Sequence, residues 1–290
     1  MTNVFSRKDY EVSYVFAQRY LTLGRKLRLL FGFYASAILH RFTRGGGHNT
    51  TISIAGLKVR TSSFENARAI IREIFLLGDY YFKSDRSNPV IVDCGGNIGI
   101  STLYFKWLYP EAQITVFEPA PLNVQMLREN IQMNALKNVD VVEAAVSDKE
   151  GEITFWFNDS HPGGSTSVKD VSTSKSGQVA YTEQSVKCVR LSEYIKGKTV
   201  DLLKIDIEGA EGIVIKELAE SGALRGVQNI IMEYHYNLKN TENRLADLVS
   251  RLEEAGFKII IFSNEAGEGS ESLLARKQYH FLLRAARVAH

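Results

Sequence analysis

The chain has 290 residues, of which 44% are hydrophobic and 23% charged, so it is long enough to bury a substantial core. Its formal net charge of +2 produces no strong basic field, which argues against nucleic-acid binding. The two cysteines, Cys94 and Cys188, lie far apart and show no CxxC spacing. They argue against a disulfide framework or a cysteine zinc site, and favour a reducing, cytoplasmic compartment.

The first 85 residues differ from the rest of the chain in their pattern of predicted helices and strands. Helical patterns cover residues 10–39, a hairpin pattern covers 51–61, and an apolar-periodic run covers 65–82. We therefore expect residues 1–85 to form an N-terminal helical cap with a short hairpin, which helps to shape an acceptor site. Residues 86–290 are expected to form the main domain.

One apolar stretch, Leu29 to Leu39, is flanked by basic residues on both sides. It is eleven residues long, whereas a membrane crossing needs about 20. The stretch therefore indicates a helix packed on its own domain, with peripheral membrane contact through residues 25–44 as the less favoured alternative.

After residue 85, strand patterns alternate with helix patterns, which predicts a mostly parallel sheet with helices on both faces. The expected strands are VIVDC (90–94), QITVFE (113–118), VDVVEAAV (139–146), DLLKID (201–206), NIIMEYH (229–235), FKIIIF (257–262) and HFLLRA (280–285). The expected helices cover residues 100–109, 122–134, 210–220 and 242–255. Residues 151–195 have the pattern of an insertion that begins and ends with strand-like segments around a Gly/Ser-rich loop.

Polar residues end several of these strands, where open α/β sheets bind their ligands. The first strand ends in Asp93 and runs into a glycine turn, but Cys94 replaces the first glycine of the dinucleotide fingerprint. A carboxylate beside the turn would repel a pyrophosphate, yet it suits a cationic ligand such as S-adenosyl-L-methionine. Glu118, at the end of the second strand, can accept hydrogen bonds from ribose hydroxyls. The alternative is that Asp93 and Glu118 are solvated carboxylates that cap a turn and a strand end.

The ordered motifs VIVDCGGNIGIST, ITVFEPAPLNVQMLREN, VVEAAVSD, CVRLSEYI, LLKIDIEGAE and IIMEYH resemble those of the FkbM-type S-adenosylmethionine-dependent methyltransferases. The resemblance runs from about Pro89 to the C-terminus and leaves the first 85 residues unmatched. It implies a class I methyltransferase fold, with a seven-stranded sheet and one antiparallel strand near its end. It also implies methyl transfer to an oxygen, often a sugar or natural-product hydroxyl. The cofactor contacts that it implies are Asp93, Gly95, Asn97, Gly99 and Glu118, with Ala145 or its neighbours near the adenine. Gly96 belongs to the same turn, at a position where the family often has alanine or another small residue.

Methyl transfer to a neutral hydroxyl is helped by a base that removes its proton. Asp206 and Glu208 alternate after the fourth strand, and Glu233 and His235 alternate in the fifth, so each pair is expected to share a face. We predict His235 as general base, with a structural histidine as the alternative. Asp206 and Glu208 are expected to take part in catalysis, each by orienting either the methyl end of the cofactor or the acceptor hydroxyl. Glu208, Glu233 and His235 are expected to contact the acceptor. A divalent metal held by these four residues is a less favoured alternative.

Local patterns predict roles for two further regions, the loop over residues 161–167 and the start of the helix expected over 210–220. In HPGGSTS (161–167), Ser165 and Thr166 are expected to contact the acceptor as the loop closes, unless the segment is merely an exposed hairpin loop. Glu211, in the first turn of the helix expected over 210–220, is interpreted as structural, because negative charge is favoured there.

The sequence thus predicts an S-adenosylmethionine-dependent O-methyltransferase that acts on a hydroxyl of a sugar in a glycan, glycolipid or glycosylated natural product. Two alternatives stay open: an NAD(P)-dependent oxidoreductase on a related sheet, and a non-catalytic cofactor-binding scaffold. The expected partner is a small-molecule or glycan acceptor. The oligomeric state is open, with a homodimer among the alternatives.

Overall fold

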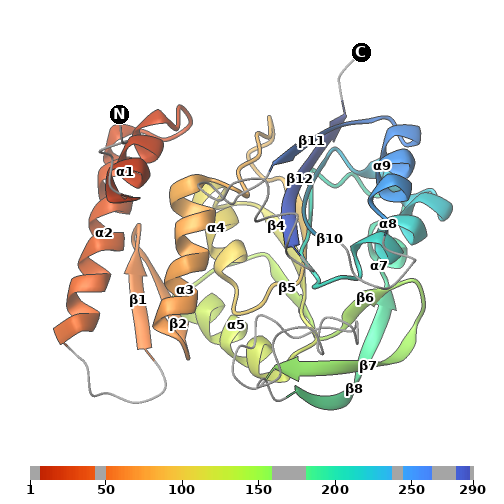
Figure 1. The fold of residues 1–290 in the computed structure, drawn as a ribbon, viewed down its shortest axis with the longest axis horizontal. Coiled ribbons are helices and arrows are strands. Elements are labelled where there is room, and N and C mark those ends of the chain that lie inside the picture. The colour runs from red at the N-terminus through yellow and green to blue at the C-terminus, as the bar shows by residue number, and fades with distance from the viewer. Residues whose placement is uncertain (1–6, 43–49, 159–180, 237–243, 263–278, 288–290) are drawn as a thin grey trace. The chain divides into compact units, whose positions relative to one another are not determined.

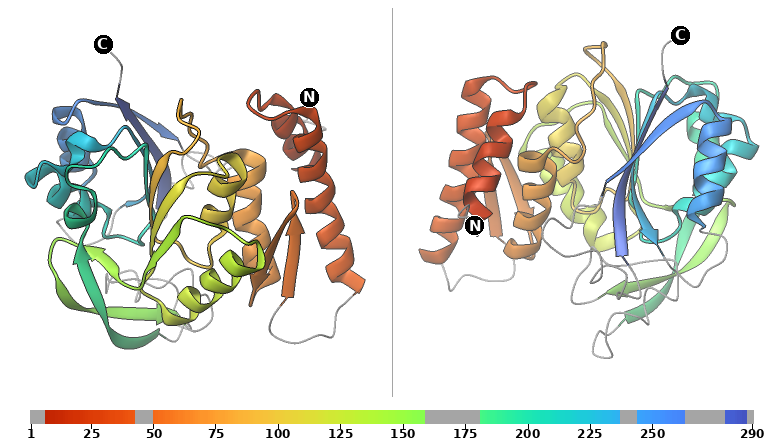
Figure 2. Two further views of the ribbon diagram at one scale, coloured as in Figure 1. Left: turned by 180° about the vertical axis from the view of Figure 1, so that it is seen from behind. Right: turned by 45° about the horizontal axis from the view of Figure 1, so that its top comes forward.

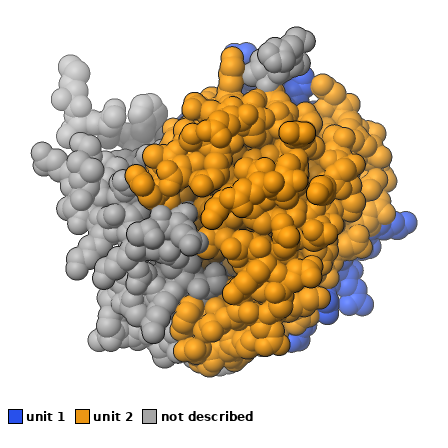
Figure 3. Space-filling view, turned by 90° about the vertical axis from the view of Figure 1, so that its right-hand side faces the viewer, with its two compact units in different colours: residues 1–83, 98–110, 125–137 blue, residues 84–97, 111–124, 138–290 orange. Residues whose placement is uncertain are grey.

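The computed structural model describes residues 7–42, 50–158, 181–236, 244–262 and 279–287. Its chain divides into two compact units, coloured separately in Figure 3. Unit 1 comprises residues 1–83, 98–110 and 125–137, and unit 2 comprises residues 84–97, 111–124 and 138–290. The chain thus crosses between the units several times.

A seven-stranded sheet forms the centre of unit 2 (Figure 1). Its strands are β3 (Val90–Cys94), β4 (Gln113–Phe117), β5 (Val139–Val142), β9 (Leu202–Ile205), β10 (Asn229–Tyr236), β11 (Phe257–Phe262) and β12 (Tyr279–Arg287). They lie in the order β11-β12-β10-β9-β3-β4-β5, and only β12 runs antiparallel to its neighbours. This arrangement confirms the predicted class I methyltransferase fold, including the single antiparallel strand near the end of the sheet.

The helices of unit 2 include α7 (Leu191–Ile195), α8 (Glu211–Glu220) and α9 (Leu245–Glu254), with the 3-10 helix η3 (Ala223–Gly226). Helices α8 and α9 lie side by side along one face of the sheet (Figure 2). The spacing of Leu245, Leu248 and Leu252 puts these side chains on one stripe of α9, and Leu248 and Leu252 are buried. The amphipathic pattern therefore determines which side of α9 faces the core.

The two central strands, β3 and β9, are almost completely buried, as expected for parallel strands covered on both faces. Apolar residues such as Val92, Leu203 and Ile205 form the core there. Two charged residues, Asp93 and Lys204, lie within these same strands and are equally buried. Buried charges of this kind need partners, which draws attention to the carboxyl ends of β3 and β9.

The segment predicted as one strand over 139–146 is in fact two short strands. β5 ends at Val142, and a turn closed by the Ala144 amide donating to the Val142 carbonyl (3.0 Å) precedes β6 (Ala145–Ser147). β6 leaves the main sheet and pairs with β8 (Tyr181–Arg190), which pairs in turn with β7 (Gly151–Asn158). The insertion therefore begins and ends with strands, while Ser165 and Thr166 lie outside the described residues.

Unit 1 contains α1 (Arg7–Ala17), α2 (Leu23–Phe42), the hairpin β1 (Thr50–Ile54) and β2 (Leu57–Thr61), α3 (Phe64–Ile71) and the π-helix η1 (Arg72–Leu77). It also contains α4 (Ile100–Leu108) and most of α5 (Pro121–Met133). The hairpin is joined to α5 because the side-chain amides of Asn130 and Asn134 bond to the backbones of Arg60 and Lys58. None of the helices in the described ranges combines the length and apolarity needed to cross a membrane.

Candidate active site

The glycine turn after β3 lies between β4 and β9, where the order of the parallel strands reverses. The amides of Gly95 and Gly96 donate to the Phe117 carbonyl at 2.9 and 3.0 Å, which holds the turn against the end of β4. Gly95 has a φ of +83°, and a Cβ atom there would overlap the carbonyl oxygen of Asp206. Glycine is therefore required at this position both for its backbone conformation and for the close approach of β9.

A cavity of about 600 Å³, including its open mouth, lies at these strand ends. Six of the predicted site residues line it: Gly95, Asn97, Glu118, Ala145, Asp206 and Glu208. Five others do not line it: Asp93, Gly96, Gly99, Glu233 and His235. The wall also contains Ala144, a neighbour of Ala145, and residues for which the sequence predicts no contact, among them Asn123, Phe155, Ile207 and Ala210.

Glu118 connects the end of β4 to the glycine turn. One carboxylate oxygen accepts from the Asn97 amide at 2.8 Å, and the other accepts from the Ala120 amide at 3.0 Å and from Asn123 Nδ2 at 3.2 Å. Burial raises the pKa of the Glu118 carboxyl, and the hydrogen bonds from Ala120 and Asn97 partly offset this rise. The carboxylate is thus held rigidly at the wall of the cavity.

Asp93 lies below the cavity, where its carboxylate pairs with an ammonium group. Lys204 Nζ is 3.3 Å from Asp93 Oδ1 and 3.7 Å from Asp206 Oδ2, and it donates to the carbonyls of Cys94 (3.2 Å) and Gly95 (2.6 Å). Burial lowers the pKa of the Lys204 ammonium, but the carboxylates of Asp93 and Asp206 outweigh burial and hold that pKa above its usual value. Lys204 therefore ties together the ends of β3 and β9.

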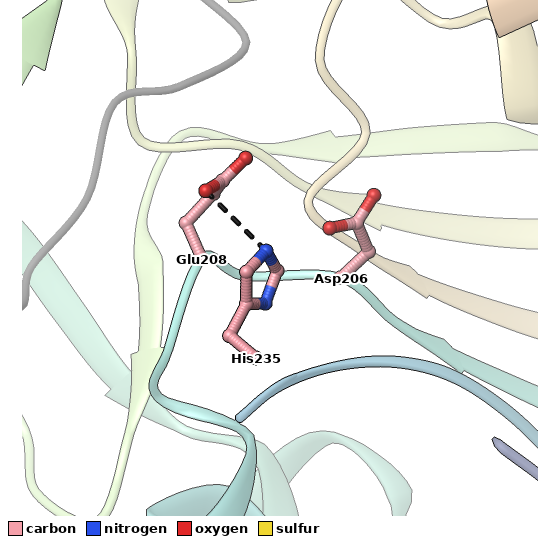
Figure 4. Close-up of side chains that lie close together, drawn as sticks. All are labelled: Asp206, Glu208 and His235. Atoms are coloured by element: carbon pink, nitrogen blue, oxygen red, sulfur yellow. Dashed lines mark ion pairs between the residues drawn. The ribbon is translucent and has the colours of Figure 1, made fainter. Parts of the chain in front are cut away.

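Asp206 and Glu208, which line the cavity, come together with His235 (Figure 4). Glu208 lies in a left-handed backbone conformation, with a φ of +55°, in the turn between β9 and α8. Because β9 ends at Ile205, the turn that follows it positions the side chains of Asp206 and Glu208. Glu208 Oε2 is 3.4 Å from His235 Nε2.

The imidazole of His235 is oriented by a second carboxylate. Nδ1 lies 2.9 Å from Oε1 of Glu211, which is fully buried and also accepts from the Gly209 amide. Because a carboxylate only accepts hydrogen bonds, Glu211 places a proton on Nδ1 and leaves Nε2 as the atom that exchanges protons. Burial lowers the pKa of His235, but Glu211 and Glu208 outweigh burial and raise that pKa well above its usual value.

One ligand atom each from Asp206, Glu208 and His235 lies within 4.8 Å of the others, a spacing that a divalent ion could bridge. Glu233, in β10, raises the pKa of His235 but is outside the group of three.

Sequence reasoning missed the roles of two residues, although signals for both were present. Lys204 is a charged residue inside the apolar strand motif LLKID, and a buried lysine requires a carboxylate partner. Glu211 was interpreted as a helix-terminal charge, whereas the structure shows it bound to His235. Its partner could not be found from spacing, because the two residues are brought together only by the β9-α8 turn.

The cavity suits the expected methyl donor in its chemistry. Small-molecule sites typically have largely apolar walls and a few fixed polar groups. Here Ala144, Ala145 and Phe155 provide apolar wall, while Glu118 and Asp206 provide carboxylates. These two carboxylates can accept hydrogen bonds from ribose hydroxyls and attract positive charge, and S-adenosylmethionine carries both.

Comparisons with known proteins agree with this geometry. Residues 93–259 match the family model of the methyltransferase FkbM domain. The chain is 34% identical to methyltransferase sdnD of Sordaria araneosa, covering 58% of this chain and 74% of that protein. It is 30% identical to the 2-O-methyltransferase NoeI of Sinorhizobium fredii (55% and 65% covered) and 26% identical to the 31-O-demethyl-FK506 methyltransferase FkbM of Streptomyces tacrolimicus (71% and 87% covered). The chain therefore belongs to the FkbM methyltransferase family and is an S-adenosylmethionine-dependent methyltransferase.

Proposed function

We propose that this enzyme transfers a methyl group to a hydroxyl of a sugar in a glycan, glycolipid or glycosylated natural product. The observation that carries the proposal is the group formed by Asp206, Glu208 and His235 at the cavity. Carboxylate oxygens accept hydrogen bonds from hydroxyls, and a sugar offers several hydroxyls side by side. The names of two relatives, a 2-O-methyltransferase and a 31-O-demethyl-FK506 methyltransferase, support an oxygen acceptor.

The cofactor is proposed to lie in the 600 Å³ cavity. Glu118 would accept hydrogen bonds from its ribose hydroxyls, and Ala145 would contact the adenine. Asp206 would lie near the sulfonium. When bound, S-adenosylmethionine supplies an electrophilic methyl group, and the protein aligns it with the acceptor oxygen.

His235 is proposed to accept the proton of the acceptor hydroxyl at Nε2. The buried Glu211 carboxylate holds Nδ1–H at 2.9 Å and stabilises the imidazolium that forms. Glu208, 3.4 Å from Nε2, would position the acceptor against the imidazole. Asp206, on the other side of His235 from Glu208 in Figure 4, would face the methyl donor, so that the acceptor oxygen can approach the methyl group beside it.

Substituting Glu118 by glutamine is expected to raise the dissociation constant for S-adenosylmethionine about tenfold or more, because hydrogen bonds to a charged acceptor are lost. Isothermal titration calorimetry measures the change. Glu111→Gln, at an exposed position before β4, is the matched control and should bind normally. Equal affinity in the two variants would remove Glu118 from the cofactor site.

The acceptor class is tested by measuring the release of S-adenosylhomocysteine with a panel of hydroxyl compounds. The panel pairs free sugars, oligosaccharides and glycolipids with non-sugar alcohols of similar size. We expect turnover with at least one sugar-containing acceptor, and mass spectrometry of the product should place the added methyl on an oxygen. Turnover confined to non-sugar alcohols, or methylation of nitrogen or carbon, would contradict the proposal.

A further inference from the structure

Helix α2 of unit 1 has an exposed apolar face. Leu23, Leu27, Phe31, Ile38 and Phe42 have between 53% and 82% of their surface exposed. At 100° per residue, these five side chains fall within an arc of about 100° on one side of the helix. The opposite side carries Leu29 and Phe33, which are buried. The exposed side chains of this arc are therefore apolar except for Arg41 at its edge, where an ordinary surface helix would be polar. Tyr34 also falls within the arc, but it is half-buried and donates to Glu11.

Basic residues accompany this face. Helix α2 contains Arg25, Lys26, Arg28 and Arg41, and no aspartate or glutamate. On the helical projection, Arg41 and Arg28 fall at the two borders of the apolar stripe, and both are exposed. Arg25 and Lys26 point elsewhere, because Arg25 stacks over Trp107 and Lys26 donates to the Phe16 carbonyl.

The combination of an apolar stripe and bordering arginines indicates which kind of partner surface could cover α2. Pairing of this face with the same face of a second copy would gather four arginines, Arg28 and Arg41 of each helix, along one interface, with no acidic residue on either helix to compensate. An anionic phospholipid surface offers apolar chains to the stripe and phosphates to the two arginines. The helix, about 30 Å long, would lie in the plane of the interface.

We propose that the outward face of α2 binds the surface of anionic phospholipid membranes. Phe31 and Phe42 would insert among the lipid chains, while Arg28 and Arg41 reach the headgroups. The inference does not depend on the identity of the methyl acceptor, because it rests on the surface of unit 1 alone.

The test is sedimentation of the full chain with vesicles. We expect the chain to bind vesicles that contain equal parts of phosphatidylcholine and phosphatidylglycerol, and to bind poorly to pure phosphatidylcholine. Raising the salt concentration should weaken binding, because it screens the arginines. The double variant Phe31→Ser/Phe42→Ser should lower the partition coefficient about tenfold or more, since two large apolar groups are lost.

Two controls make the outcome decisive. Leu122→Ser removes an equally exposed apolar side chain in unit 2 and should bind as the unsubstituted chain does. Arg28→Gln/Arg41→Gln should abolish the preference for anionic lipid. Failure of the unsubstituted chain to sediment with anionic vesicles would overturn the proposal. So would a concentration-dependent dimer, measured by light scattering, that the phenylalanine variant dissociates, because the face would then be a self-association interface.

Discussion

Replacing Lys204 by methionine is expected to lower the free energy of unfolding by about 3 to 5 kcal/mol, because it leaves a buried carboxylate without its counter-charge. Asp93 is fully buried and lies 3.3 Å from the Lys204 ammonium, which is itself 2% exposed. Methionine preserves most of the side-chain volume, so the change removes chiefly the charge and its hydrogen bonds. Urea denaturation monitored by circular dichroism measures the loss.

The same substitution should weaken S-adenosylmethionine binding, because Lys204 also holds the carbonyls of Cys94 and Gly95 at the turn beside the cavity. The control is the double variant Asp93→Asn/Lys204→Met, in which no buried charge of this pair remains. It should be clearly more stable than Lys204→Met alone. If the double variant is no more stable than Lys204→Met, the loss of stability in Lys204→Met does not come from breaking the ion pair with Asp93.

Replacing His235 by glutamine is expected to lower kcat by roughly a hundredfold or more, which is the usual contribution of a general base. The dissociation constant of the cofactor should change little, because His235 does not line the cavity. Turnover assays and calorimetry on the same preparation separate the two effects. Unchanged kcat would show that His235 is structural.

The pH dependence of turnover tests the partner of His235. Because Glu211 and Glu208 raise the pKa of His235, the neutral imidazole forms only at a higher pH than in an ordinary histidine. Activity should therefore rise with pH through this raised pKa. Glu211→Gln removes the carboxylate on Nδ1, lowers the pKa and should move the rise to lower pH.

The matched control is Glu220→Gln, an exposed position at the other end of α8. It should leave the pH profile in place. A profile that is identical for Glu211→Gln and the unsubstituted enzyme would mean that another group controls the protonation step.

Several features of the fold could be predicted because they depend on local patterns. The predicted strand 90–94 has the same first and last residues as β3, and the hydrophobic runs located the remaining strands of the main sheet. The segment 139–146 was the exception, because an apolar run does not reveal that the chain turns at Ala144 and changes sheet.

The choice between enzyme classes also follows from the motifs. Cys94 in place of a fingerprint glycine and Asp93 beside the turn disfavoured a dinucleotide. Membership of the FkbM methyltransferase family decides against both the oxidoreductase and the non-catalytic alternatives.

By itself, the sequence determined the order of the strands along the chain, the glycine turn and the residue types at the strand ends, because these depend on near neighbours in the chain. The tertiary structure alone decided which charges meet: Lys204 with Asp93 across two strands, and Glu211 with His235 across a turn and a strand. Those pairings depend on strand order in the sheet and on the left-handed turn at Glu208. Neither leaves a periodic pattern in the sequence, since a buried charge is stabilised by whichever partner the fold brings within reach.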